Sequence, residues 1–371
     1  MERIETHVLV IGGGAVGLAI ARAQALAGRE VIVLERGAAC GAETSTRNNQ
    51  VVHAGFLYEG GTLKAQLCRV GHGALLDYAR ARGIAHRTAP KLMLALDEGD
   101  LPQLEGMMAQ GRAAGLTGLQ RLDTAQLAQL EPGIVAAGAL LSPDTAIIDA
   151  GTLVTALQAD LEDAGGLVAT RTQATGGALA QAGHVIDAVD ADGTAMQITA
   201  RLVINAAGLG AAPLSQALTG AAPTIHFAKG QFLSHRGATG LHHMVVLLGA
   251  ALGQGASLTW DTGGQERFGP DISFAAGRDY GLQAPDPQTI AAIRRWYPAL
   301  DPARLAPEYA GIRPRVTGPG HPPGDWLVTQ DHPRLIQLFG IDTPGLTCCL
   351  ALAAHVAGLS GLETIPQRNA S

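Results

Sequence analysis

The first forty residues switch between two periods of apolar positions. Residues 7–11 form a short β-branched run, residues 15–26 have helical composition, and residues 31–34 are apolar again before Glu35. This pattern predicts a strand, a helix and a second strand. Three consecutive glycines separate the first strand from the helix, which indicates a tight turn between them.

The rest of the chain predicts helices and strands in blocks of different composition. Gly83 ends a helix over 63–82, and further helices are expected at 101–115, 124–130 and 151–164. Strands are expected at 91–96, 201–204, 257–260, 309–313 and 335–339, with a hairpin turn at 192–193. The apolar run 345–362 follows Pro344 and contains His355, which favours a buried helix over a membrane span.

These blocks indicate an α/β protein in which two domains are interleaved. Residues 1–82, 149–220 and 305–371 are expected to form a Rossmann-like parallel sheet with helices that binds a dinucleotide. Residues 83–148 and 221–304 are expected to form an α+β substrate domain around an antiparallel sheet. Each domain is therefore assembled from separate stretches of the chain.

Composition narrows the range of functions. The 371 residues are 47% hydrophobic, enough for a large core, and the formal net charge is −6 without a Lys or Arg run. A nucleic-acid partner is therefore not expected. The four cysteines show neither zinc-site spacing nor disulfide density, so we expect free thiols, no metal and a reducing compartment. The opening MERIET is a poor signal peptide, which indicates a cytoplasmic protein.

A G-x-G-x-x-G motif of Gly12, Gly14 and Gly17 lies directly between the first strand and the first helix. Gly12 permits the tight turn, Gly14 lets the backbone approach a pyrophosphate, and Gly17 allows close packing of helix on strand. Glu35 ends the second strand, where an acid accepts hydrogen bonds from ribose hydroxyls. These residues predict a dinucleotide site, which either NAD or FAD could occupy.

A polar segment then replaces the simple crossover of a nicotinamide enzyme. This segment, STRNNQVVHAG at 45–55, is rich in donors, and its hydroxyls and Arg47 could hold a pyrophosphate. With LKAQLCRVG, RGIAHRTAPKLMLAL, RLVINAAG, LTWDTGGQERFGPD, YAGIRPR and QLFGIDTPGLT, it resembles the L-2-hydroxyglutarate dehydrogenase/oxidase family, which is related to D-amino-acid and glycine oxidases. The resemblance runs nearly end to end and implies FAD as the tightly bound cofactor.

The resemblance also implies which residues contact FAD. Thr44, Ser45, Arg47 and Asn48 match contacts to the pyrophosphate and the flavin. The helix that begins near residue 345 would direct its positive end at the flavin pyrimidine and stabilise negative charge on the reduced flavin. The other positions expected at the cofactor are Ala15, Val16, Arg36, Ala207, Gly208, Gly311, Gly340, Ile341, Gly345, Leu346 and Thr347.

Two residues are candidates for the chemistry itself. His53 is the histidine inside a flavin-facing motif, so we expect it to remove the hydroxyl proton of the substrate, although packing against the flavin is an alternative role. Arg313 matches a position beside the flavin and could form a bidentate pair with a substrate carboxylate; the alternative is an ordinary salt bridge. Lys64 and Lys229 lie in family-like segments and rank lower.

The chain departs from the family pattern in its middle segment. The family carries Tyr-Pro-Val-Pro and, later, His-Leu-Thr, whereas this chain has HMVVLL at 243–248 and Ser-Leu-Thr at 257–259. His242 or His243 could compensate only after a shift in register. A more apolar pocket would suit a less charged hydroxy acid, an amino acid or an amine.

The expected reaction is hydride transfer from the α-carbon of a small 2-hydroxy acid, similar to 2-hydroxyglutarate, to flavin N5. Three alternatives stay open: an amine or amino-acid oxidase on the same scaffold, a flavin-binding protein without catalysis, and an NAD-dependent dehydrogenase. The last of these leaves STRNNQVVHAG and GIDTPGLT unexplained. The electron acceptor is left open among oxygen, a quinone and a carrier protein.

Overall fold

The computed structural model describes residues 2–248 and 255–361, and within them two eight-stranded sheets and one three-stranded sheet form. The strands of the first large sheet are β1 (Glu2–Ile11), β2 (Val31–Leu34), β9 (Leu167–Ala169), β10 (Gln173–Ala178), β11 (His184–Val189), β12 (Ala195–Asn205), β18 (Leu327–His332) and β19 (Leu335–Phe339). Their order is β10-β11-β12-β1-β2-β9, and β19 pairs with both β12 and β18. The centre of this sheet is parallel, with β1 between β12 and β2.

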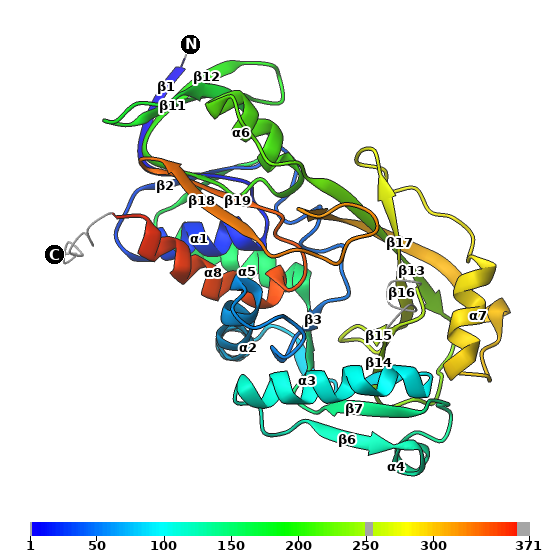
Figure 1. Ribbon diagram of the computed structural model, residues 1–371. Coiled ribbons are helices and arrows are strands. Elements are labelled where there is room, and N and C mark those ends of the chain that lie inside the picture. Colours follow the sequence, from blue (N-terminus) through cyan, green and yellow to red (C-terminus); the bar gives the residue numbers. More distant parts are fainter. Residues whose placement is uncertain (1, 249–254, 362–371) are drawn as a thin grey trace.

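Helices cover both faces of the first sheet (Figure 1). The helices of the chain are α1 (Ala15–Leu26), α2 (Leu63–Arg82), α3 (Leu101–Ala113), α4 (Thr124–Leu130), α5 (Ala150–Asp163), α6 (Ala211–Thr219), α7 (Pro287–Trp296) and α8 (Gly345–Leu359). In β1, Val8 and Val10 pack in one core with α1, α5 and α8, while Leu9 and Ile11 pack in another with α6. A strand buried on both faces therefore reads as a continuous apolar run.

The second large sheet is mostly antiparallel. Its strands are β5 (Lys91–Ala95), β6 (Gln120–Asp123), β7 (Gly138–Ser142), β13 (His226–His235), β14 (Met244–Leu247), β15 (Leu258–Trp260), β16 (Glu266–Ala275) and β17 (Leu305–Arg315). They follow the order β17-β13-β16-β15-β14-β5-β7-β6, in which β14 and β5 are parallel. Helix α7 covers one part of it because Trp296 is fully buried and its ring lies 6.2 Å from that of Phe268.

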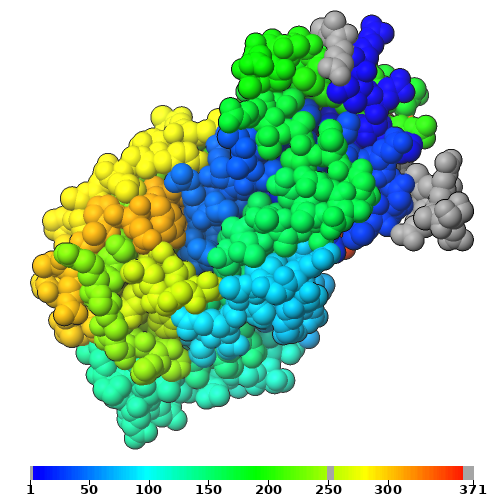
Figure 2. Space-filling view, turned by 180° about the vertical axis from the view of Figure 1, so that it is seen from behind, coloured from blue at the N-terminus to red at the C-terminus, as the bar shows by residue number. Residues whose placement is uncertain are grey.

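A small sheet and α2 join the two large sheets. Its strands are β3 (Val51–Val52), β4 (His86–Thr88) and β8 (Ala146–Ile148), in the order β3-β8-β4. Thr62 caps the start of α2 by accepting a hydrogen bond from the amide of Ala65, and Gly83 ends the helix at φ 64°. From behind, the blue segment between α1 and α2 lies between the lobe of the first sheet and that of the second (Figure 2).

The expected α/β class with parallel and antiparallel sheets is confirmed. The boundary expected at residue 305 needs correction, because β17 pairs with β13 along its whole length and so belongs to the antiparallel sheet. The strand expected at 7–11 begins at Glu2, since residues 2–6, which are mostly polar, continue the pairing with β12. Leu362, the expected end of the last helix, lies outside the described residues.

The described part of the chain contains neither a cluster of metal ligands nor a helix suited to span a membrane. Among residues 2–248 and 255–361, no three His, Cys, Asp or Glu side chains are arranged to hold a metal ion. No helix in this part of the chain combines the length and apolar character that crossing a membrane requires.

Candidate functional site

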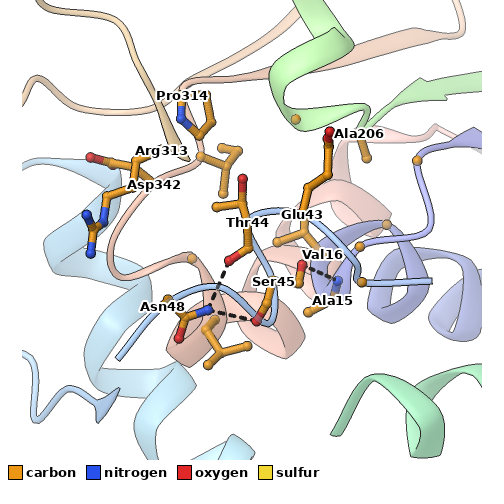
Figure 3. A pocket seen from close by; sticks show the side chains of 18 of the residues that line it. Ala15, Val16, Glu43, Thr44, Ser45, Asn48, Ala206, Arg313, Pro314 and Asp342 are labelled. Carbon is orange, nitrogen blue, oxygen red and sulfur yellow. Dashed lines mark hydrogen bonds between the residues drawn. The ribbon is translucent and has the colours of Figure 1, made fainter. Parts of the chain in front are cut away.

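A deep pocket with an empty volume of about 1230 Å³ opens at the carboxyl ends of β1, β2, β12 and β19. This is the edge at which open parallel sheets bind their ligands. In Figure 3 the pocket runs from Ala15, Val16 and Ala206 at one end to Arg313 and Asp342 at the other.

The glycine motif forms the turn that lets a ligand approach the backbone. Gly12 has φ 113°, and a Cβ atom there would lie 2.4 Å from the carbonyl oxygen of Ala206. At Gly17 a Cβ atom would lie 1.9 Å from the carbonyl oxygen of Gly12. Helix α1 begins here without a side-chain cap at Gly14, so the positive end of its dipole faces the pocket.

Glu35 is held at the end of β2 by two backbone amides. Its carboxylate accepts hydrogen bonds from the amide of Gly13 at 2.8 Å and from that of Gly37 at 2.6 Å. These two bonds orient the carboxylate at the pocket wall, where its remaining lone pairs can accept from a ribose. Arg36 also lines the pocket and forms an ion pair with Glu43.

The loop at 43–48 shapes the middle of the pocket (Figure 3). The hydroxyl of Ser45 accepts a hydrogen bond from the amide of Ala15 at 2.9 Å, so it occupies the start of α1. Thr44 donates to the carbonyl of Ile312 at 2.8 Å, and the amide of Asn48 donates to the carbonyls of Thr44 and Ser45. These side chains fold the loop and tie it to α1 and β17.

Three of the expected cofactor contacts lie outside the pocket lining. Arg47 stacks over the ring of Tyr280 at 4.7 Å and donates to backbone carbonyls, so its guanidinium holds two loops together. Gly311 lies beneath this loop, where a Cβ atom would be 1.8 Å from the Arg47 carbonyl oxygen. Gly340 turns the chain after β19 beside Val316. These three residues lie near the site, where the Arg47 side chain and the two glycines shape the backbone around the pocket.

The remaining expected positions do line the pocket. Ala15, Val16, Ala207, Gly208, Ile341, Gly345, Leu346 and Thr347 belong to its wall, as do Gly12, Gly14, Gly17, Glu35, Arg36, Thr44, Ser45 and Asn48. Helix α8 starts at this wall without a side-chain cap. The amide of Gly345 donates to the carbonyl of Asp342 at 2.6 Å, and the dipole of the helix still favours negative charge in the pocket.

His53 directly follows β3 and is 8% exposed. Its amide donates to the hydroxyl of Thr347 at 3.1 Å, which fixes the backbone against α8. The ring nitrogen Nδ1 is buried and has no hydrogen-bond partner among the described residues. Burial, together with the positive charges of Lys91, His72 and Arg313, lowers the pKa of His53 well below 6.5, so the imidazole is neutral at pH 7.

Arg313 reaches the pocket from β17 and is 7% exposed. Its Nη1 has no hydrogen-bond partner in the described part of the chain, and it lies where a Cβ atom on Gly230 would be. Burial and the charge of Arg315 lower the pKa of this guanidinium, although an arginine keeps its proton. Arg313 therefore brings to the pocket a buried guanidinium that forms no ion pair among the described residues, while the charge of Asp342 acts on it from nearby.

The sequence analysis missed Asp342, which lines the pocket next to Arg313. Lys64 forms a buried ion pair with it at 2.7 Å, Arg315 approaches it to 3.5 Å, and Trp326 donates to it at 3.3 Å. One carboxylate thus faces two cations, and Arg313 adds a third. The motif GIDTPGLT contains Asp342, but its ion partners lie far away in sequence.

The departures from the family pattern lie away from the pocket wall. Glu131 holds the segment at 242–243, because it accepts from the amide of His242 and contacts the ring of His243 at 2.6 Å. Neither histidine lines the pocket. Lys229 pairs with Asp279 at 2.9 Å and ties β13 to the loop that follows β16.

The residues present suit an FAD molecule. The close backbone approach at Gly12 and Gly17, the starts of α1 and α8 at the pocket wall and the carboxylate of Glu35 suit the pyrophosphate, flavin and ribose of FAD. The pocket is long enough to connect all three groups, since it extends from the start of α1 to Arg313.

The profile of the FAD dependent oxidoreductase family matches residues 7–359, so the chain belongs to that family and FAD is its cofactor. Among curated relatives, the mitochondrial L-2-hydroxyglutarate dehydrogenase of Arabidopsis thaliana is 32% identical over 403 residues, which cover 96% of this chain and 83% of the relative. The human protein of the same name is 30% identical over 46% of this chain and 37% of its own length.

Solved structures share the fold. L-alpha-glycerophosphate oxidase from Mycoplasma pneumoniae with FAD bound superposes with a TM-score of 0.89 at 21% identity, covering 99% of this chain and 97% of the other. Glycine oxidase from Geobacillus kaustophilus superposes with a TM-score of 0.81 at 21% identity, covering 96% and 95%. The expected enzyme class, an FAD-dependent oxidoreductase, is confirmed.

Proposed function

We propose that this enzyme oxidises a small 2-hydroxy acid of the 2-hydroxyglutarate type. In this proposal His53 takes the hydroxyl proton and Arg313 binds the α-carboxylate. The observation that carries it is two buried polar atoms of residues that line the FAD pocket, Nδ1 of His53 and Nη1 of Arg313, neither of which has a hydrogen-bond partner in the described part of the chain. Such atoms cost free energy when they stay unpaired, so a ligand that satisfies both is favoured.

The charges at this end of the pocket favour an acid over an amine. Lys64 and Arg315 already pair with Asp342, and Arg313 forms no ion pair of its own within residues 2–248 and 255–361. A carboxylate would supply the missing negative charge, and the planar guanidinium suits it because it can bind both oxygens. A substrate ammonium would instead add a further positive charge to the cationic cluster.

Different groups of the protein have different roles in the proposed reaction. FAD, when bound, accepts the hydride at its N5 atom. Burial lowers the pKa of His53 below 6.5, so the imidazole is neutral at pH 7 and has a ring nitrogen free to accept the hydroxyl proton. The hydrogen bond from the backbone amide of His53 to the hydroxyl of Thr347 holds His53 in place. The start of α8 would stabilise negative charge that accumulates in the pocket on reduction.

Anaerobic loss of the oxidised-flavin absorbance tests the substrate class. The purified protein with FAD is mixed with 2-hydroxy monoacids, 2-hydroxy diacids, amino acids and secondary amines, in both enantiomers where they exist. We expect bleaching by 2-hydroxy acids. Bleaching by amines or amino acids alone would overturn the proposal, and so would a yellow protein that no compound in the panel reduces.

Substitution of His53 tests its role. His53→Gln is expected to slow flavin reduction by about 10²–10⁴-fold while the FAD content stays unchanged, because only the proton acceptor is lost. His321→Gln, at an exposed position, is the matched control and should reduce at the rate of the wild type. A normal reduction rate in His53→Gln would exclude His53 as the base.

We also propose a cytoplasmic location. Its support is the state of the four cysteines, all of which are free thiols, as expected in a reducing compartment. Fractionation of the source cells, followed by detection of the protein in the cytosolic fraction, tests this; recovery in an organelle or the periplasm would contradict it.

A further inference from the structure

A segment that the proposed reaction does not use connects β16 to α7. It comprises residues 276–286, which form neither a helix nor a strand. Lys229 of β13 holds it through an ion pair with Asp279 at 2.9 Å. The side-chain amide of Gln231, also on β13, exchanges two hydrogen bonds with the backbone of Gln283, at 2.8 Å and 2.7 Å. Lys229 and Gln231 are only 8% and 9% exposed, so buried side chains attach the segment to the antiparallel sheet.

Two other side chains of this segment contact the loop at 43–48, which shapes the FAD pocket. Nε of Arg278 lies 3.1 Å from a carboxylate oxygen of Glu43. The ring of Tyr280 lies 4.7 Å from the guanidinium of Arg47. In the view from behind, the yellow part of the chain lies against the blue part that contains this loop (Figure 2). An ion pair and a cation–π contact therefore join the antiparallel sheet to the cofactor-binding lobe.

Arg278 also contacts a second segment of the pocket wall. A Cβ atom on Gly210 would lie 3.6 Å from its Nη2 atom. Gly210 directly follows Gly208 and Leu209, which line the pocket, and Glu43 lines it as well. Figure 3 shows Glu43 at the end of the pocket where Ala15 and Val16 begin α1. One guanidinium thus spans two separate wall segments at the nucleotide end of the pocket.

We propose that residues 276–286 act as a clasp that retains FAD, with Arg278 as the positioning residue that ties the two wall segments together. FAD can leave the nucleotide end of the pocket only when these segments separate, and their separation breaks the contacts of Arg278. The inference goes beyond the proposed function, because it depends on FAD and on no particular substrate. A failed search for a reducing substrate would therefore leave it open to its own test.

The expected effect is modest because the ion pair is partly exposed. The side chain of Arg278 is 33% exposed and that of Glu43 is 35% exposed. Exposed ion pairs contribute little, so Arg278→Gln should speed the release of FAD about three- to fivefold. Loss of the ring contact as well, in Arg278→Gln combined with Tyr280→Leu, should speed it about tenfold. Salt screens exposed charges, so the ratio of the Arg278→Gln rate to the wild-type rate should fall toward one at 1 M NaCl.

Release of radiolabelled FAD measures the clasp directly. The protein loaded with labelled FAD is mixed with an excess of unlabelled FAD, and the label that stays on the protein is followed over time. Arg278→Lys keeps the charge and should release FAD within about twofold of the wild-type rate. Arg295→Gln is the matched control, because Arg295 forms an exposed ion pair with Asp97 at 2.8 Å on α7, and it should release FAD at the wild-type rate.

A double-mutant comparison separates the clasp from an independent contact of Arg278 with FAD. Glu43→Gln should release FAD faster than Arg278→Gln, because Glu43 also pairs with Arg36. If Arg278 acts through Glu43, the double variant should release FAD no faster than Glu43→Gln alone. Multiplied effects in the double variant would overturn the inference. A wild-type release rate in Arg278→Gln would overturn it too, as would a wild-type protein that never releases its label.

Discussion

Replacement of Lys91 by methionine is expected to stabilise the protein, and more so at pH 7 than at pH 9.5. Burial lowers the pKa of Lys91 from 10.5 to about 8. The unfolded state therefore binds this proton more tightly than the folded state, and stability rises as the pH increases through the interval between the two values. Methionine has a similar length and no charge, so the dependence should disappear.

The size of the effect follows from the pKa difference. A shift from 10.5 to about 8 costs about 3 kcal/mol at pH 7, where both states are protonated, and about 1 kcal/mol at pH 9.5. The cost is thus about 2 kcal/mol larger at pH 7 than at pH 9.5. This difference corresponds to roughly 2–3 °C in Tm for a chain of 371 residues, at about 2.1 cal/mol/K of unfolding entropy per residue.

Thermal unfolding of both proteins at saturating FAD measures this difference. Subtracting the wild-type Tm from that of Lys91→Met at each pH cancels the contributions of cysteines and tyrosines, which both proteins share. The difference should be about 2–3 °C larger at pH 7 than at pH 9.5. A Tm difference that is the same at both pH values would refute the reasoning, and Lys229→Met should show no comparable stabilisation at pH 7.

Three further predictions concern the pocket. Gly12→Ala should yield protein without FAD, judged by flavin absorbance, because its Cβ atom would lie 2.4 Å from a carbonyl oxygen. Gly60→Ala should keep its FAD, because no atom lies within 4 Å of the added Cβ atom. Equal FAD contents in the two variants would contradict this prediction. Asp342→Asn should lower the free energy of unfolding by about 3–5 kcal/mol, since it leaves buried cations unpaired, whereas Asp77→Asn in an exposed pair should cost less than about 1 kcal/mol. Arg313→Lys should weaken apparent binding of acids at least tenfold while FAD stays bound; unchanged substrate saturation would argue against the carboxylate contact.

Local sequence patterns were sufficient for the nucleotide half of the site. The strand, glycine turn and helix at the N-terminus, and the acid that ends β2, lie within 35 residues and depend on contacts between neighbours in the chain. The helix over 63–82 could be placed to the residue, because Gly83 adopts the left-handed conformation that ends it. Such features can be recognised in the sequence because they depend on residues that lie close together in the chain.

The substrate end depended on contacts between distant residues. Lys64 meets Asp342 across 278 positions, and His53 meets Thr347 across 294. Arg47 is a second residue whose contacts the sequence does not show. Its motif predicted a cofactor contact, but the fold places its guanidinium over the ring of Tyr280. No periodicity or spacing encodes such pairs.

The sequence by itself determined the class of fold, the dinucleotide turn and, through its resemblance to a family, FAD as the cofactor. Only the tertiary structure decided which cations remain without a counter-charge, because that depends on what every neighbouring strand and helix brings to one place. Lys91 illustrates the difference. In the sequence it is merely the start of a strand, yet in the folded protein it is a cation that is only 1% exposed.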